Sequence, residues 1–82
     1  MAATAQRLPY SDRITHEPGK MGGKACIRGI RITASNVMGM LAAGESVDDI
    51  LKSYPELEPE DIPAVMDYAA WRLQESEQFV PQ

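Results

Sequence analysis

The stretch most informative about the fold is residues 33–55, which read TASNVMGMLAAGESVDDILKSYP. Thr33 is a predicted helix N-cap, and the apolar residues after it recur with helical spacing until Gly44 stops the helix. Ser46 is a second predicted N-cap, and Pro55 ends the helix that follows it. A helix, a short glycine-containing turn and a second helix have the spacing of a helix-turn-helix.

A third helix is expected from Pro59 to Gln78, because proline is well tolerated at the first helical position. Pro63 lies about one turn inside and is expected to remove one backbone hydrogen bond. One apolar stripe of this helix is formed by Ile62, Val65, Met66, Ala69 and Leu73, and a second by Ala64, Tyr68 and Trp71. Two apolar faces need two neighbours. One is the helical core, and the other is the N-terminal segment of the chain, a second copy or a different protein.

The segment before the first helix predicts a small β element. Residues 13–15 are expected to form a short strand, because β-branched side chains suit a pleated surface. Residues 26–27 and 30–32 are expected to be short extended pieces around a turn at Arg28-Gly29. Few apolar side chains hold this element.

The chain is therefore predicted to be mainly α, a single homeodomain-like, three-helix domain over residues 13–78. A β and loop element at residues 13–32 precedes the helices at 33–78. Residues 1–12 are expected to form a flexible N-terminal arm, and residues 79–82 a tail.

The size of the chain limits how it can be stabilised and where it works. A domain of 82 residues buries only about 60–65% of its unfolded surface, and small folds usually add disulfides, a metal or a partner chain. One Cys cannot form an internal disulfide, and one Cys with one His cannot fill a four-ligand zinc site. We therefore expect a homodimer without metal or cofactor. No apolar run has the length of a membrane span or of a signal-peptide core, so a cytoplasmic location is expected.

The net charge of −4 is the sum of a basic N-terminal part and an acidic C-terminal part of the sequence. Residues 1–31 carry six basic and two acidic side chains, whereas residues 32–82 carry two basic and ten acidic ones. Residues 20–31, called here the basic segment, hold four basic side chains and no acidic one: Lys20, Lys24, Arg28 and Arg31. Such a cluster is a candidate contact for phosphates or for the carboxylates of a partner. The alternative interpretation is a solvated loop.

Residues 21–32 read MGGKACIRGIRI and resemble the domain of unknown function 433 family, whose members look like GGKPCIRGTRI. The remaining matches are Arg13-Ile14, Pro18-Gly19, Leu41 to Gly44, Asp48 to Leu51, Tyr54-Pro55, Leu57, Glu60 to Ile62 and Tyr68-Ala69. Ala25 stands where proline is usual, and Pro63 also departs from the pattern. The resemblance implies a small prokaryotic helix-turn-helix protein similar to the VapB-type antitoxins, which are partnered with PIN-like ribonuclease toxins.

Two hypotheses assign a task to the basic segment. In the first, its four cations contact nucleic acid, and Gly22, Gly23 and Gly29 allow close backbone approach. Docking through the second helix is disfavoured, because Glu45, Asp48 and Asp49 at its start would be repelled by phosphates.

In the second hypothesis the basic segment contacts the toxin. Arg28 or Arg31 pairs with acidic residues of the nuclease and displaces its metal, since a guanidinium forms bidentate pairs with carboxylates. Tyr68, Trp71 and Phe79 then serve as apolar anchors at the interface.

The length of the chain weighs against an enzyme, and no catalytic residue is assigned. The function that the resemblance implies is an antitoxin and DNA-binding regulator of a toxin–antitoxin pair that neutralises a PIN-like ribonuclease. The alternative is an adaptor that binds a protein partner and no nucleic acid, because a net negative charge disfavours nonspecific DNA affinity.

Overall fold

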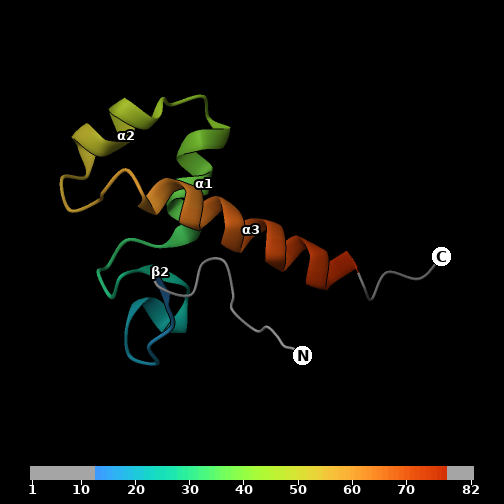
Figure 1. The fold of residues 1–82 in the computed structure, drawn as a ribbon. Helices are drawn as coiled ribbons and strands as arrows, with labels where there is room; N and C mark the ends of the chain where they lie inside the picture. The colour runs from blue at the N-terminus through green and yellow to red at the C-terminus, as the bar shows by residue number, and fades with distance from the viewer. Residues whose placement is uncertain (1–12, 78–82) are drawn as a thin grey trace.

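The computed structural model describes residues 13–77. The elements are β1 (Ile14–Thr15), the 3-10 turn η1 (Met21–Gly23), β2 (Cys26–Ile27), α1 (Ala34–Ala42), α2 (Val47–Ser53) and α3 (Asp61–Glu77). Figure 1 shows three helices preceded by a short β element, which confirms the predicted class. The homeodomain-like arrangement stays a prediction. The predicted arm, residues 1–12, and tail, residues 79–82, lie outside the described residues.

The β element is a two-stranded antiparallel ladder in which Ile14 lies opposite Ile27. After β2 the chain reverses through Arg28 and Gly29, which have φ values of 46° and 74°. The third predicted extended piece lies beside β2, because the Ile27 N–H donates to the carbonyl of Ile32 over 3.0 Å. Glycine adopts positive φ freely, whereas Arg28 does so only because other contacts hold it there.

The first two helices start and stop as the sequence predicts. The Thr33 side chain accepts a hydrogen bond from the Asn36 N–H, and the Ser46 side chain accepts one from the Asp49 N–H, each over 3.1 Å. At the end of α1, Gly44 has φ of 92° and its N–H donates to the carbonyl of Leu41. This glycine closure satisfies carbonyls that the helix end would leave unpaired.

The third helix starts later than predicted. It begins at Asp61, two residues beyond Pro59, and a tight turn precedes it in which the Asp61 N–H donates to the carbonyl of Glu58 over 2.9 Å. Pro63 is consequently the third residue of α3, inside the first turn. The N–H groups of a first turn have no partner within the helix, so the expected loss of a backbone hydrogen bond at Pro63 is wrong.

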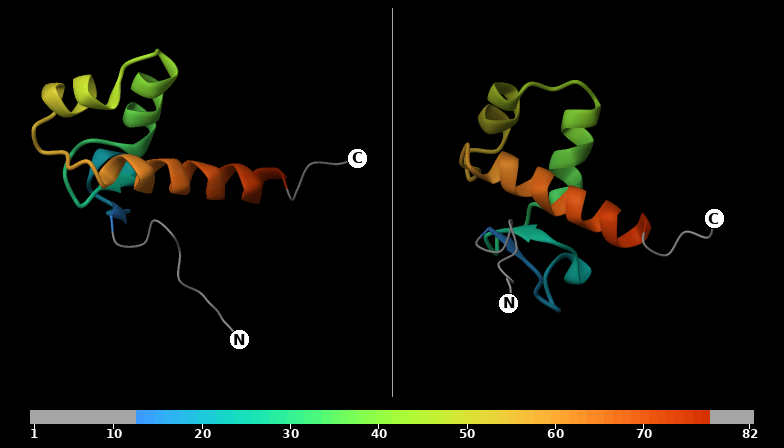
Figure 2. Two further views of the ribbon diagram at one scale, coloured as in Figure 1. Left: turned by 45° about the horizontal axis from the view of Figure 1, so that its top comes forward. Right: turned by 45° about the vertical axis from the view of Figure 1, so that its right-hand side comes forward.

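Helix α3 lies between the α1–α2 pair and the β element (Figures 1 and 2). Val65 of α3 is fully buried and belongs to one core cluster with Val37 and Ile50 of the other helices and with Ile14 and Ile27 of the strands. The β element is therefore the second neighbour of the first half of α3. Of the three neighbours considered from the sequence, the N-terminal segment of the chain, and not a second copy or another protein, covers this half of the helix.

The second half of α3 extends past the body of the domain (Figure 2). Along the first predicted stripe Ile62 and Val65 are buried, but Met66 is 44% exposed and Leu73 is 63% exposed. Tyr68 and Trp71 on the second stripe are half-buried. No helix among the described residues is long and apolar enough to cross a membrane.

Candidate functional site

The carboxylate of Asp61 is the organising group of the β–α3 junction. Its side chain is fully buried at the start of α3. Arg13 Nη1 donates to Oδ1 over 2.8 Å, and Arg28 donates through Nη2 to Oδ2 over 3.0 Å and through Nε to Oδ1 over 3.1 Å. The Glu58 N–H donates to Oδ2 over 2.8 Å. Arg13, Arg28, Glu58 and Asp61 are called the Asp61 cluster below.

Both arginines of the cluster are held by further contacts. Arg28 Nη2 also donates to the carbonyl of Glu56 over 2.7 Å, and its backbone N–H donates to the carbonyl of Arg13 over 2.8 Å. Arg13 pairs with the Glu58 carboxylate over 2.9 Å. These contacts explain how a residue other than glycine keeps positive φ at position 28.

The cluster stays charged. Burial by itself would raise the pKa of Asp61, but hydrogen bonds from Arg28, the Glu58 backbone and Arg13 outweigh it and lower that pKa below its ordinary value of 3.8. The hydrogen bonds that Arg13 donates to Glu58 and Asp61 raise the pKa of Arg13, and the bond that Arg28 donates to Asp61 raises the pKa of Arg28. All buried polar side-chain atoms in the described part of the chain have a hydrogen-bond partner.

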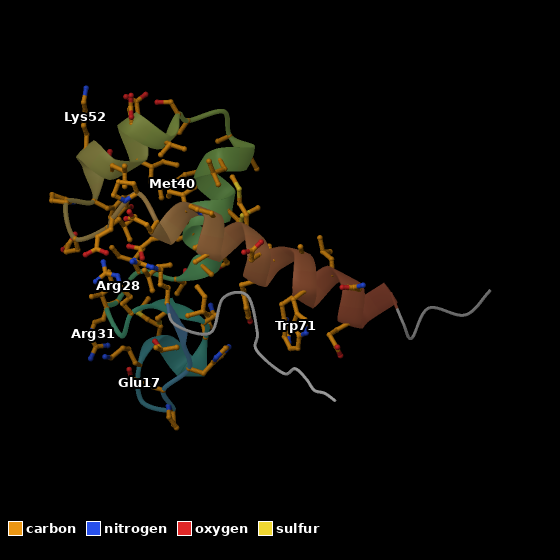
Figure 3. All side chains as sticks on the ribbon, viewed as in Figure 1. Glu17, Arg28, Arg31, Met40, Lys52 and Trp71 are labelled. Atoms are coloured by element: carbon orange, nitrogen blue, oxygen red, sulfur yellow. The ribbon has the colours of Figure 1, made fainter. Side chains whose placement is uncertain are left out.

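The four predicted contact cations of the basic segment differ in whether they form ion pairs within the folded chain. Arg28 belongs to the Asp61 cluster, and Lys20 pairs with Glu17 over 3.3 Å and donates to the carbonyl of Gly29. Lys24 and Arg31 are exposed and form no ion pair with any acid in residues 13–75. In Figure 3 the labelled Arg28 and Arg31 lie on one side of the domain and Trp71 on the other.

The three glycines of the segment also differ. Gly22 and Gly23 have φ values of 68° and 80°, and a Cβ added at either would meet open space. Beside Gly29 an added Cβ would come within 3.2 Å of Glu17 Oε2. The chain therefore fills the space next to Gly29 itself, and only the first two glycines lie open to a ligand.

Two hollows lie along the exposed half of α3. The first, called the cationic cleft, has a volume of about 560 Å³, and its lining includes His16, Lys24, Ser35, Tyr68 and Arg72. The second, called the apolar groove, has a volume of about 340 Å³ and runs between α1 and α3. Ala34, Met38, Ala69 and Leu73 line the groove together with Ser35, Tyr68 and Arg72, which it shares with the cleft.

Of the predicted interface aromatics, Tyr68 lines both hollows and Trp71 lies beside it. The Tyr68 and Trp71 ring centroids are 6.3 Å apart, and Tyr68 Oη lies 3.4 Å from His16 Nε2. Phe79 lies outside the described residues. No group of three or more His, Cys, Asp or Glu side chains within residues 13–77 is placed to hold a metal ion.

Sequence reasoning missed Asp61, Arg13 and Arg72. The preference of helix starts for acids is enough to account for an acidic residue at position 61, and it requires no arginine. Its partner Arg28 is 33 residues away, and no local pattern connects the two. No sequence pattern apart from its charge marks Arg72 as a candidate site residue.

Replacing Asp61 with Asn should lower the free energy of unfolding by about 3 kcal/mol, because the neutral amide leaves two arginine side chains without their shared carboxylate. Urea denaturation followed by circular dichroism measures the change. Glu60→Gln is the matched control: it removes the neighbouring acid, which is exposed, and should leave the midpoint unchanged. Equal effects of the two substitutions would contradict a structural role for the cluster.

The stabilisation by Asp61 should disappear in acid. Because its pKa is lower in the folded chain than in the unfolded one, the contribution is complete above about pH 5 and is lost as the pH falls through the lowered folded pKa. The difference in unfolding free energy between the wild type and Asp61→Asn should accordingly narrow below about pH 4. Denaturation series from pH 7 to pH 2 test this, and a difference that stays constant would refute it.

Comparison with known proteins agrees with the resemblance noted in the basic segment. An uncharacterized protein of Sinorhizobium fredii (strain NBRC 101917 / NGR234), y4eO, is 36% identical over 56 residues, which are 68% of this chain and 25% of that protein. The chain thus spans about a quarter of the length of this relative. No solved structure matches. Residues 14–69 match the family described as "Protein of unknown function (DUF433)", and the chain belongs to that family.

Proposed function

We propose that this chain is an antitoxin-like regulator of a toxin–antitoxin pair: a homodimeric, cytoplasmic binding protein rather than an enzyme. Its partner is a PIN-like ribonuclease, which it engages through the second half of α3. The observation that carries the proposal is the exposure of Leu73, on the part of α3 that extends beyond its own domain. Met66, seven residues earlier on the same helix face, is exposed as well. Large apolar side chains gathered on one exposed helix face are typical of interaction surfaces.

The apolar groove supports a protein partner on this face. Its lining is almost entirely apolar, and it lies between the first turn of α1 and the exposed part of α3. An apolar side chain of a partner placed there would bury both its own surface and that of Leu73 and Met38, at about 25 cal/mol per Å² of apolar area. Half-buried aromatic residues beside such a groove are the residue types that dominate binding energy at interfaces.

The choice between Arg28 and Arg31 as the group that pairs with toxin carboxylates is narrowed by the Asp61 cluster. Arg28 would have to leave a buried carboxylate, which would then lose much of its charge compensation. Arg31 is exposed and has no acidic partner among the described residues. We therefore assign this role to Arg31.

Operator DNA is a second candidate partner, and the unpaired cations Lys24 and Arg31 favour it. Asp48 and Asp49 occupy the exposed first turn of α2, so phosphates would repel the start of that helix. Two cations of the basic segment have no acidic partner among residues 13–75, which gives four such cations in a symmetric dimer. That number is sufficient for weak, salt-dependent binding, whereas the adaptor alternative predicts none.

Leu73→Asp should abolish inhibition of the proposed PIN-like ribonuclease partner, because it places a charge beside the apolar groove. Gln74→Asp adds the same charge at an exposed position of the same helix and is the matched control. The measurement is RNA cleavage by the purified ribonuclease with increasing antitoxin, together with co-purification of the two proteins. Equal inhibition by both variants would rule out the α3 face as the contact.

DNA binding through the free cations should show a slope of log K against log salt of about −3 to −4 for the dimer, at about −0.9 per neutralised phosphate. Arg31→Gln should move the slope toward zero by about 2. Lys52→Gln removes an exposed cation of α2 instead and should leave the slope unchanged. Fluorescence anisotropy with a labelled operator-length duplex measures the slopes. Affinity that does not depend on salt would exclude this role and favour the adaptor.

A further inference from the structure

The cationic cleft is a second feature of α3, and it shares three lining residues with the apolar groove. Three segments distant in sequence bring basic or hydrogen-bonding side chains to it: His16 after β1, Lys24 before β2, and Arg72 on α3. None of the described residues that line it is an Asp or Glu. Glu17, the acid next to His16 in sequence, is paired with Lys20. Within the described part of the chain, the cleft therefore gathers positive charge without an acidic partner, in a protein whose net charge is −4.

The first turn of α1 adds donors to the same cleft. Ser35 lines it, and the N–H groups on either side of Ser35 are already used: that of Ala34 donates to the carbonyl of Ala25, and that of Asn36 to the Thr33 hydroxyl. The N–H of Ser35, the second residue of α1, has no acceptor within its own helix. A free N–H at the positive end of a helix favours a bound anion.

We propose that the cationic cleft binds a small organic phosphate ester. Lys24 and Arg72 neutralise its phosphate, to which Ser35 and His16 donate hydrogen bonds. A phosphate monoester carries between one and two negative charges and three acceptor oxygens. It can therefore use two cations and additional donors at once, whereas a carboxylate has one charge and two oxygens.

The volume and the neighbour of the cleft indicate the rest of the ligand. A volume of about 560 Å³ lies in the range of small-molecule sites and exceeds the needs of a phosphate group alone. The cleft continues into the apolar groove through the shared residues Ser35, Tyr68 and Arg72. The organic part of the ester therefore lies toward Tyr68 and the groove, where a flat or apolar group such as a nucleobase has apolar contacts.

The test uses the isolated chain and no partner protein, so its result does not depend on the proposed function. Adenosine 5′-monophosphate, inorganic phosphate and uncharged adenosine are titrated by calorimetry at low salt. The monophosphate should bind most tightly and adenosine should not bind detectably. Lys24→Gln and Arg72→Gln should each weaken monophosphate binding at least tenfold. Lys52→Gln, the same change on the exposed face of α2 and far from Trp71 in Figure 3, should alter it less than twofold.

A further variant separates the two parts of the site. Leu73→Ala, which changes the groove alone, should weaken the monophosphate several-fold and leave inorganic phosphate unchanged. Thermal denaturation confirms that each variant is folded. The proposal is overturned if the wild type binds neither phosphate compound, if Lys52→Gln weakens binding as much as Lys24→Gln, or if duplex DNA binds through these residues while the monophosphate does not.

Discussion

The fold depends on one buried carboxylate. Asp61 is the common acceptor for Arg13 before β1, Arg28 after β2 and the backbone of Glu58 before α3. A two-stranded ladder with two residues in each strand is too short to be stable alone, so its place on α3 must be set by contacts outside the ladder. Ile14 and Ile27 supply the apolar part of those contacts, which does not depend on direction. The paired guanidinium groups supply the directional part, because they fix both the position and the rotation of the β element.

The same interaction decides how much positive charge remains at the surface. In the sequence the front of the chain is basic and the back acidic, but folding pairs one with the other: Arg28 with Asp61 and Arg13 with Glu58. The basic segment is therefore less cationic in the folded protein than in the sequence. Arg72 increases the positive charge near Lys24, because folding brings this side chain from the acidic half of the sequence to the same cleft. The cationic surface that results is assembled from both halves of the chain.

The features that the sequence could predict are those determined within a few residues. Thr33 and Ser46 cap helices by accepting bonds from N–H groups three residues away, so the local pattern is sufficient. The Asp61 cluster joins residues 33 and 48 positions apart, and such pairing depends on the fold itself. The apolar spacing of residues 62–73 correctly predicts a helix with an apolar face, yet Leu73 on that face is exposed. Periodicity identifies an apolar face, but it does not tell whether the rest of a small domain reaches far enough to cover it.

The length of α3 explains why binding surfaces gather at its second half. Seventeen residues make a helix of about 25 Å, and α1 crosses α3 at a steep angle instead of running along it (Figures 1 and 2). The body of the domain therefore covers only the first half, and the groove and the cleft both open where that cover ends. Because the two hollows share Ser35, Tyr68 and Arg72, a ligand that orders these side chains in one of them must alter the affinity of the other. Thermodynamic linkage makes this coupling reciprocal, so a phosphate ester in the cleft and a protein in the groove would each change the affinity for the other by the same factor.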